Sequence, residues 1–130
     1  MRVLSMLILT LSLSVAAFAS EAPEMTQEEM MQAWMEAATP GPHHEDLAKL
    51  AGEWTFTTTS YEGPEPATVS TGTAVKSMIL GGRYLQEETQ GESMGMPFHG
   101  IGLLGYNKVT GEYEWIWYDN MSTGMMHGTG

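Results

Sequence analysis

The residues best suited to hold a metal ion are methionines and a histidine in the second half of the chain. Met94 and Met96 flank a single glycine, and Met125, Met126 and His127 are consecutive. Thioether and imidazole groups are ligands that Cu(I) prefers, so these five residues make a candidate copper site. No pair among them has the closed spacing of a tetrahedral site, and methionine is also a common filler of apolar cores. Copper binding is therefore the third of three functional hypotheses.

A second group of potential ligands, suited to zinc, is the run His43, His44, Glu45 and Asp46. Only residues three or four apart share a face of a helix, so four neighbours cannot all point at one ion. Acidic residues are favoured at the N-terminal end of a helix by its dipole. We therefore interpret the run as the capped start of a short helical turn over residues 43–51. Its buried side and C-terminal cap would be Leu47, Leu50, Ala51 and Gly52.

Acid–base catalysis would need paired titratable groups inside a pocket. Glu87 and Glu88 are neighbours in a strand-like segment, so they point to opposite faces and at most one can enter an interior. Arg83, Glu87 and Tyr113 are conceivable interior polar groups, although an ordinary surface ladder explains them equally well. An enzyme acting on a small exported metabolite is thus the second hypothesis. The chain contains no P-loop, no dinucleotide-binding glycine motif and no zinc-protease helix motif.

The leading hypothesis is a non-enzymatic binding or structural module. A small β-barrel can hold one apolar molecule in a cavity lined by alternating inward side chains. Aromatic residues there would combine apolar area with a polar group that orients the ligand. No cofactor is expected. The predicted lining residues are Trp54, Phe56, Leu85, Phe98, Leu103, Trp115 and Trp117.

These residues lie in a region, 53–130, in which strand-like runs are interrupted at short intervals by glycine. Such glycines are typical of antiparallel sheets that turn tightly or bring backbones close together. Gly81 and Gly82 suit a hairpin, and residues 91–97 and 107–111 read as loops. The predicted strands cover residues 54–61, 69–80, 83–90, 98–106 and 112–118, and a sixth begins at 123. We therefore predict a mainly β fold, an antiparallel meander curled toward a barrel.

A helix is predicted over residues 26–39. Thr26 and Glu29 have the spacing of a capping box, and Met25 and Met30 could form a hydrophobic staple around it. Pro40 ends the helix. We expect this helix to pack on one end of the sheet through an apolar stripe of Met30, Met31, Trp34, Met35 and Ala38.

Six strands are fewer than the roughly eight that close a small barrel. An open sheet leaves unpaired edges, so we expect the chain to be a fragment that lacks the closing strands. Alternatively, a second copy of the chain could complete the sheet by strand exchange and give a homodimer.

The first residues read as a secretory signal. An apolar run follows Arg2, and Ala17, Phe18 and Ala19 give the small-x-small pattern that precedes cleavage. We predict a signal peptide over residues 1–19, cleaved after Ala19, then a linker over 20–25 and a single domain over 26–130. The product would be exported to the periplasm or the medium and not held in a membrane. The net charge of −11 and the five basic residues argue against nucleic-acid partners.

Consecutive segments also resemble a known family. They are AATPGPHH, LAKLAGEW, MILGGRYLQEE, GMPFHGIGLLGYN and YEWIWYDNMSTGMM, in that order. From about Met30 onward the chain resembles a bacterial family catalogued as domain of unknown function 1579. The resemblance implies a calycin-like, that is lipocalin-like, barrel and no particular activity. Trp54 matches the tryptophan that plugs one end of lipocalins, but no arginine follows Arg83 to cross it.

Overall fold

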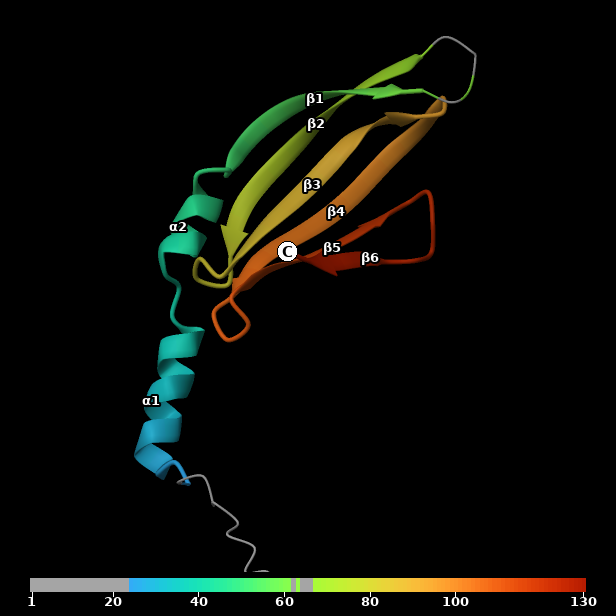
Figure 1. Cartoon of the computed structure of the whole chain (residues 1–130). Helices are drawn as coiled ribbons and strands as arrows, with labels where there is room; N and C mark the ends of the chain where they lie inside the picture. The colour runs from blue at the N-terminus through green and yellow to red at the C-terminus, as the bar shows by residue number, and fades with distance from the viewer. Residues whose placement is uncertain (1–23, 62, 64–66) are drawn as a thin grey trace, which may run out of the picture.

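The computed structural model describes residues 24–61, 63 and 67–130 (Figure 1). The predicted signal peptide and most of the predicted linker lie outside these residues. The described part contains two helices followed by six strands. Their bounds are α1 (Gln27–Ala38), α2 (Pro42–Ala48), β1 (Gly52–Ser60), β2 (Thr68–Ile79), β3 (Tyr84–Ser93), β4 (Met96–Asn107), β5 (Glu112–Asp119) and β6 (Met126–Thr129).

The six strands form one antiparallel sheet in the order β1-β2-β3-β4-β5-β6. Each strand pairs with the next along the chain, so the sheet is a meander. The two outer strands, β1 and β6, do not pair with each other, and the sheet is curved but unclosed (Figure 1). The prediction of a mainly β antiparallel meander is confirmed.

The capping box at the start of α1 forms as predicted. The Glu29 amide donates to Thr26 Oγ1 at 3.2 Å, and the Thr26 amide donates to Glu29 Oε2 at 2.8 Å. The predicted packing of α1 is wrong, because the helix stands away from the sheet (Figure 1) and has no buried residue. Trp34 is 67% exposed, and Met30, Met31 and Met35 are each more than half exposed. The apolar stripe is therefore largely exposed.

α2 packs against the sheet where α1 does not. Gly41 is its N-cap residue and Pro42 its first residue, a position where proline loses no hydrogen bond. Leu47 is 3% exposed, and α2 contacts β2, β3 and β4. The helix is shorter than predicted: Leu50 is exposed rather than buried, and Gly52 opens β1 with φ of 137° instead of capping a helix.

The turns explain several glycines of the sequence. Gly81 and Gly82 connect β2 to β3 with φ of 67° and 80°, a region that other residues rarely adopt. The connection from β3 to β4 is tighter than the predicted loop over 91–97, because β3 continues to Ser93 and β4 resumes at Met96. Gly95 turns there with φ of 75°.

The register assigns every strand residue to one of two faces. Trp54 pairs with Ala74, Ala74 with Thr89, Thr89 with Gly100 and Gly100 with Asp119, and these five residues share one face. We call this side of the sheet the α2 face. Leu50, which follows α2, borders a hollow together with Lys76, Glu87 and other residues of this face. In the part of the chain that the structure describes, the buried apolar side chains are few, namely Leu47, Ala74 and Leu85.

Candidate functional site

The register gathers most of the predicted lining residues on the α2 face. Six of the seven lie there: Trp54, Phe56, Leu85, Phe98, Trp115 and Trp117. Leu103 is the exception, because it pairs with Gln86 and Ile116 on the opposite face. Its neighbour Leu104 occupies the α2 face between Leu85 and Trp115. A shift of one residue reverses the face of a strand residue, which is why the sequence alone chose the wrong leucine.

Glycines lie beneath the aromatic rings of this face. A Cβ atom added to Gly100 would overlap the six-membered ring of the Trp117 indole, and one added to Gly102 would lie 3.0 Å from it. In the same way, Phe56 covers Gly72 and Trp115 covers Gly128. The missing side chains let the rings lie against the backbone. The α2 face therefore presents broad aromatic surfaces instead of ring edges.

An ion pair lies in the middle of the α2 face. Lys76 Nζ is 2.9 Å from Glu87 Oε2, and these residues are direct partners in β2 and β3. Thr89 Oγ1 donates to Glu87 Oε1 at 2.9 Å. Lys76 also lies over the Trp54 ring, 5.8 Å from its centroid. The side chains of Lys76 and Glu87 are 24% and 30% exposed, so the pair is partly shielded from water.

Two of the three indoles on this face are held by hydrogen bonds. Trp54 Nε1 donates to the Leu50 carbonyl, and Trp117 Nε1 donates to Asp119 Oδ2, each at 2.9 Å. Among the described residues, Trp115 makes no such bond, and it is 43% exposed. Its N–H group lies on the part of the ring that covers Gly128.

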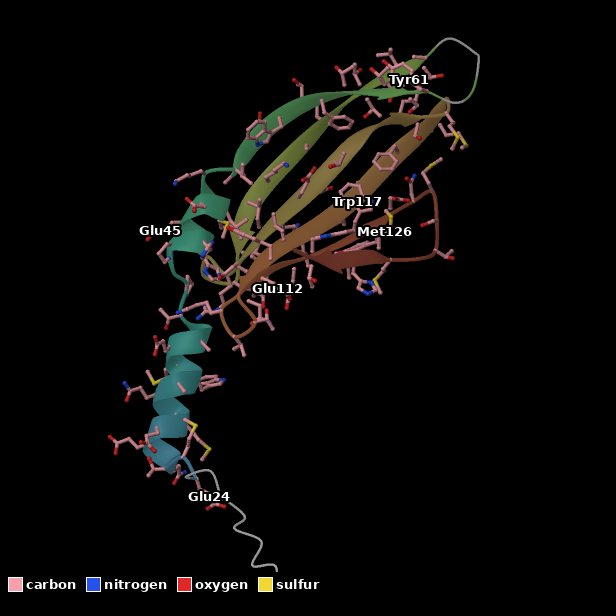
Figure 2. The ribbon with its side chains drawn as sticks, viewed as in Figure 1. Glu24, Glu45, Tyr61, Glu112, Trp117 and Met126 are labelled. Carbon is pink, nitrogen blue, oxygen red and sulfur yellow. The ribbon has the colours of Figure 1, made fainter. Side chains whose placement is uncertain are left out.

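The central part of the face is hollowed. A depression of about 270 Å³ is bordered by Leu50, Lys76, Leu85, Glu87, Gly102, Leu103, Leu104, Trp115, Ile116 and Trp117. Trp117 lies over the middle of the sheet, and its cross-strand partner Met126 lies beside it on β6 (Figure 2). The depression has an apolar wall and one charged pair, a composition typical of sites for small organic molecules.

The run from His43 to Asp46 does not converge on a point. His43 stacks on Tyr106 with ring centroids 3.9 Å apart, and its Nδ1 lies 3.0 Å from the Tyr113 hydroxyl. His44 Nδ1 instead accepts a hydrogen bond from the Gly41 amide. The interpretation as a helix start is confirmed, with the cap supplied by His44 and not by an acid.

The polar residues considered for catalysis are dispersed. Glu87 and Glu88 point to opposite faces as predicted, and Glu88 Oε1 lies 3.0 Å from His99 Nε2 on the far side. Arg83 lies in the β2–β3 turn, where it donates to the Leu80 carbonyl. Tyr113 is on the α2 face but is bonded to His43. The three residues Arg83, Glu87 and Tyr113 contact different groups.

The methionines considered as copper ligands come from two segments: Met94 and Met96 lie at the β3–β4 turn, whereas Met125 and Met126 lie just before and at the start of β6. Met94 and Met125 are 73% and 66% exposed. Met126 pairs with Trp117 on the α2 face, whereas its neighbour His127 pairs with Ile116 on the opposite face. In the described part of the chain, no three His, Cys, Asp or Glu residues are placed to share a metal ion.

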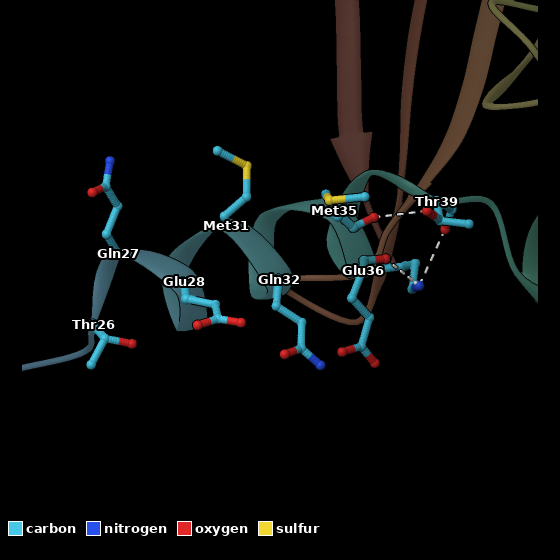
Figure 3. A pocket seen from close by; sticks show the side chains of 9 residues that line it. Thr26, Gln27, Glu28, Met31, Gln32, Met35, Glu36 and Thr39 are labelled. Atoms are coloured by element: carbon cyan, nitrogen blue, oxygen red, sulfur yellow. Dashed lines mark hydrogen bonds between the residues drawn. The ribbon is translucent and has the colours of Figure 1, made fainter.

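A larger hollow, of about 1030 Å³, runs along α1. Figure 3 shows its lining side chains along this one helix and the residues that flank it. Lys108 also borders the hollow and donates to the carbonyls of Glu36 and Thr39. One exposed helix bounds most of this space. Despite its volume, the hollow lacks the opposing walls of a binding site.

Sequence reasoning missed Lys76 and Thr89 as parts of the site. A lysine and a threonine in a strand are ordinary surface residues, and only the strand register places both beside Glu87. The alternation of Trp54 with Phe56 and of Trp115 with Trp117 was the signal that located the face.

Comparison with known proteins agrees with the resemblance seen in the sequence. The profile of the family described as "Protein of unknown function (DUF1579)" matches residues 39–130. The match begins after α1, later than the expected start at Met30. No curated protein and no solved structure matches the chain significantly. Neither α1 nor α2 combines the length and apolarity that a helix needs to cross a bilayer. Because the match covers α2, the whole sheet and most of the sequence, the chain belongs to the DUF1579 family.

Proposed function

We propose that this domain binds one small, mainly apolar molecule on the α2 face. The observation that carries the proposal is the gathering of Trp54, Phe56, Phe98, Trp115 and Trp117 on one face around a single ion pair. Rings that lie over glycines offer flat, rigid area to a ligand at little entropic cost. The protein would act as a carrier or sensor rather than as a catalyst.

The polar centre would give the bound molecule its orientation. Lys76 retains donors beyond its bond to Glu87. A ligand with one hydroxyl or carbonyl group could accept from Lys76 while its apolar part covers the rings. We expect uncharged ligands to be favoured, because Lys76 and Glu87 already neutralise each other.

Binding can be measured with the uncharged fluorescent probe N-phenyl-1-naphthylamine. Trp34 on α1 would obscure the signal, so Trp34→Phe serves as the background protein. Its remaining tryptophans, Trp54, Trp115 and Trp117, all lie on the α2 face. The expected result is saturable energy transfer from these tryptophans to the probe.

A matched pair of variants locates the binding surface. Trp115→Ala should weaken probe binding by about tenfold or more, because a central aromatic contact is lost. Tyr118→Ala removes an aromatic side chain of similar exposure from the opposite face and should leave binding unchanged. Equal weakening by both variants, or no saturable binding by the background protein, would contradict the proposal. Circular dichroism of each variant checks that it is folded.

We also propose that the domain works outside the cytoplasm. The support is the apolar run and the cleavage pattern at Ala17–Ala19 in the sequence. Expression of the whole chain in a bacterial host should yield a periplasmic product whose measured mass corresponds to a chain that begins at Ser20. A product that stays in the cytoplasm and retains Met1 would refute this.

A further inference from the structure

The basic side chains of this acidic chain differ in whether they form ion pairs. The described residues contain four lysines and arginines, in a chain of net charge −11. Lys49 pairs with Asp46 at 2.6 Å, and Lys76 pairs with Glu87 at 2.9 Å. Within the same residues, neither Arg83 nor Lys108 has a carboxylate within ion-pair distance. Both border one hollow.

That hollow has a volume of about 320 Å³ and lies at the α2 end of the sheet. It is separate from the depression on the α2 face, and no residue borders both. Its walls come from the end of α1, from α2, from the β2–β3 turn and from β4 and β5. The bordering residues are Ala37, Ala38, His44, Arg83, Tyr84, Gly105, Tyr106, Asn107, Lys108 and Glu114.

Both cations keep donors for a ligand. Arg83 uses one of its N–H groups in a 3.0 Å bond to the Leu80 carbonyl, and a guanidinium has five. Lys108 donates to the carbonyls of Glu36 and Thr39 at 2.6 and 3.1 Å, and an ammonium has three protons. These bonds also hold the two side chains in place. The donors are thus partly preorganised.

His44 adds a third donor. The residue is 7% exposed, and its Nδ1 accepts from the Gly41 amide at 3.0 Å. The neutral ring must then carry its proton on Nε2. Among the described residues, every buried side-chain nitrogen or oxygen has a hydrogen-bond partner. His44 Nε2 has no partner among them, so it cannot be one of the buried atoms. Nε2–H is therefore not fully buried, and His44 borders both this hollow and a neighbouring one of about 230 Å³.

One carboxylate opposes these groups. Glu114 borders the hollow, but its Oε1 accepts from Asn107 Nδ2 at 2.8 Å, and its side chain is exposed to water. Two cations against one solvated carboxylate leave the hollow with a positive excess. The charge of the hollow is therefore opposite in sign to the net charge of the chain, which is −11.

We propose that this hollow binds the oxyanion of a small molecule, a carboxylate or a phosphate, through Arg83, Lys108 and His44. Arginine recognises both groups through paired N–H donors, and lysine adds a point charge. Tyr84 and Tyr106 would flank the rest of the ligand. The site does not depend on the binding function proposed for the α2 face.

Heteronuclear NMR tests the proposal with two probes, sodium phosphate and sodium benzoate, each titrated into the chain at constant ionic strength. At least one probe should give saturable shifts at Gly105 and Asn107. Saturation by phosphate alone identifies a phosphoryl group, and saturation by benzoate identifies a carboxylate. Either result supports the site.

Variants make the assignment specific. Arg83→Gln should weaken binding by about tenfold or more, since a charge-assisted hydrogen bond is lost. Lys49→Gln removes the same charge from the exposed pair with Asp46 and should leave binding within about twofold, because that pair is screened by water. Shifts that never saturate, or equal binding by Arg83→Gln and the parent chain in spectra that show both folded, would overturn the proposal.

Discussion

At the scale of single residues, Trp117 is fixed from two sides. Its Nε1 is bonded to Asp119, and its ring lies over Gly100 and Gly102. Gly100→Ala should therefore push the indole out of place and lower the free energy of unfolding by about 1–3 kcal/mol. Urea denaturation measures the change.

The matched control for that substitution is Gly124→Ala. No atom lies within 4 Å of a Cβ added at Gly124, and its backbone conformation suits other residues. Its effect should stay within about 0.5 kcal/mol, as for ordinary surface changes. Equal stability of the two variants would show that Trp117 does not rest on Gly100.

The pair Lys76–Glu87 gives a second prediction at this scale. Lys76→Met leaves a partly shielded carboxylate without its cation and should cost about 1–3 kcal/mol of stability. Adding Glu87→Gln should recover part of this loss, because the uncompensated charge is removed. A double-mutant cycle in urea should give a coupling of about 0.5 kcal/mol or more. Strictly additive effects would mean that the pair is not formed in solution.

At the scale of elements, the stability of α1 depends on the hydrogen bonds that cap it. A helix of 12 residues is marginal in water by itself, and α1 buries no residue. The bonds from the Thr26 amide and hydroxyl hold the pKa of Glu29 below its ordinary value of 4.5. A carboxyl whose pKa is lowered by folding stabilises the helix above that ordinary value. This contribution is lost as the pH falls through the lowered pKa.

We therefore expect α1 to fray on acidification below about pH 4.5 while the sheet persists. Cα chemical shifts of α1, followed against pH, measure the fraying. Thr26→Ala should lower helicity at neutral pH and flatten the pH response, because the capping box is gone. An unchanged pH response in Thr26→Ala would contradict this account. The shifts of β3 and β4 provide the internal control.

The sequence predicted the elements better than their packing. Alternation and glycine placement located all six strands, with β3 and β4 longer than expected because Glu92 and Ser93 continue the ladder. The helical stripe of Met30 and Trp34 correctly indicated a helix but not its surroundings. Periodicity reports which residues share a side of an element. It does not report whether another element covers that side.

The site was predictable in its residue types and not in its register. Alternating aromatic residues identified Trp54, Phe56, Trp115 and Trp117, since two residues two apart in a strand must share a face. Nothing local distinguishes Leu103 from Leu104, and the partner of Glu87 is known only once β2 and β3 are aligned. The hollow around Arg83 and Lys108 joins segments far apart in sequence, so no motif announces it.

At the scale of the whole molecule, the outer edge of β1 offers nine residues for pairing with another chain. We propose that two copies associate along such an edge, because its backbone groups have no strand partner among the described residues. Light scattering should give a mass that rises with concentration. Thr57→Lys should favour the monomer, whereas Thr110→Lys in the β4–β5 turn should not. Dissociation by Trp34→Ala but not by Thr57→Lys would refute the edge contact.

The glycines beneath the rings have a consequence for how such a surface can change. Each ring lies where the Cβ atom of any residue other than glycine would stand, so the covered glycine determines the tilt of the ring. A single methyl group gained at Gly100 or Gly128 would shift the ring of Trp117 or Trp115 without changing the identity of any side chain that a ligand touches. The shape of the recognition surface can therefore be tuned from its hidden side, at positions that a search for contacting residues would pass over.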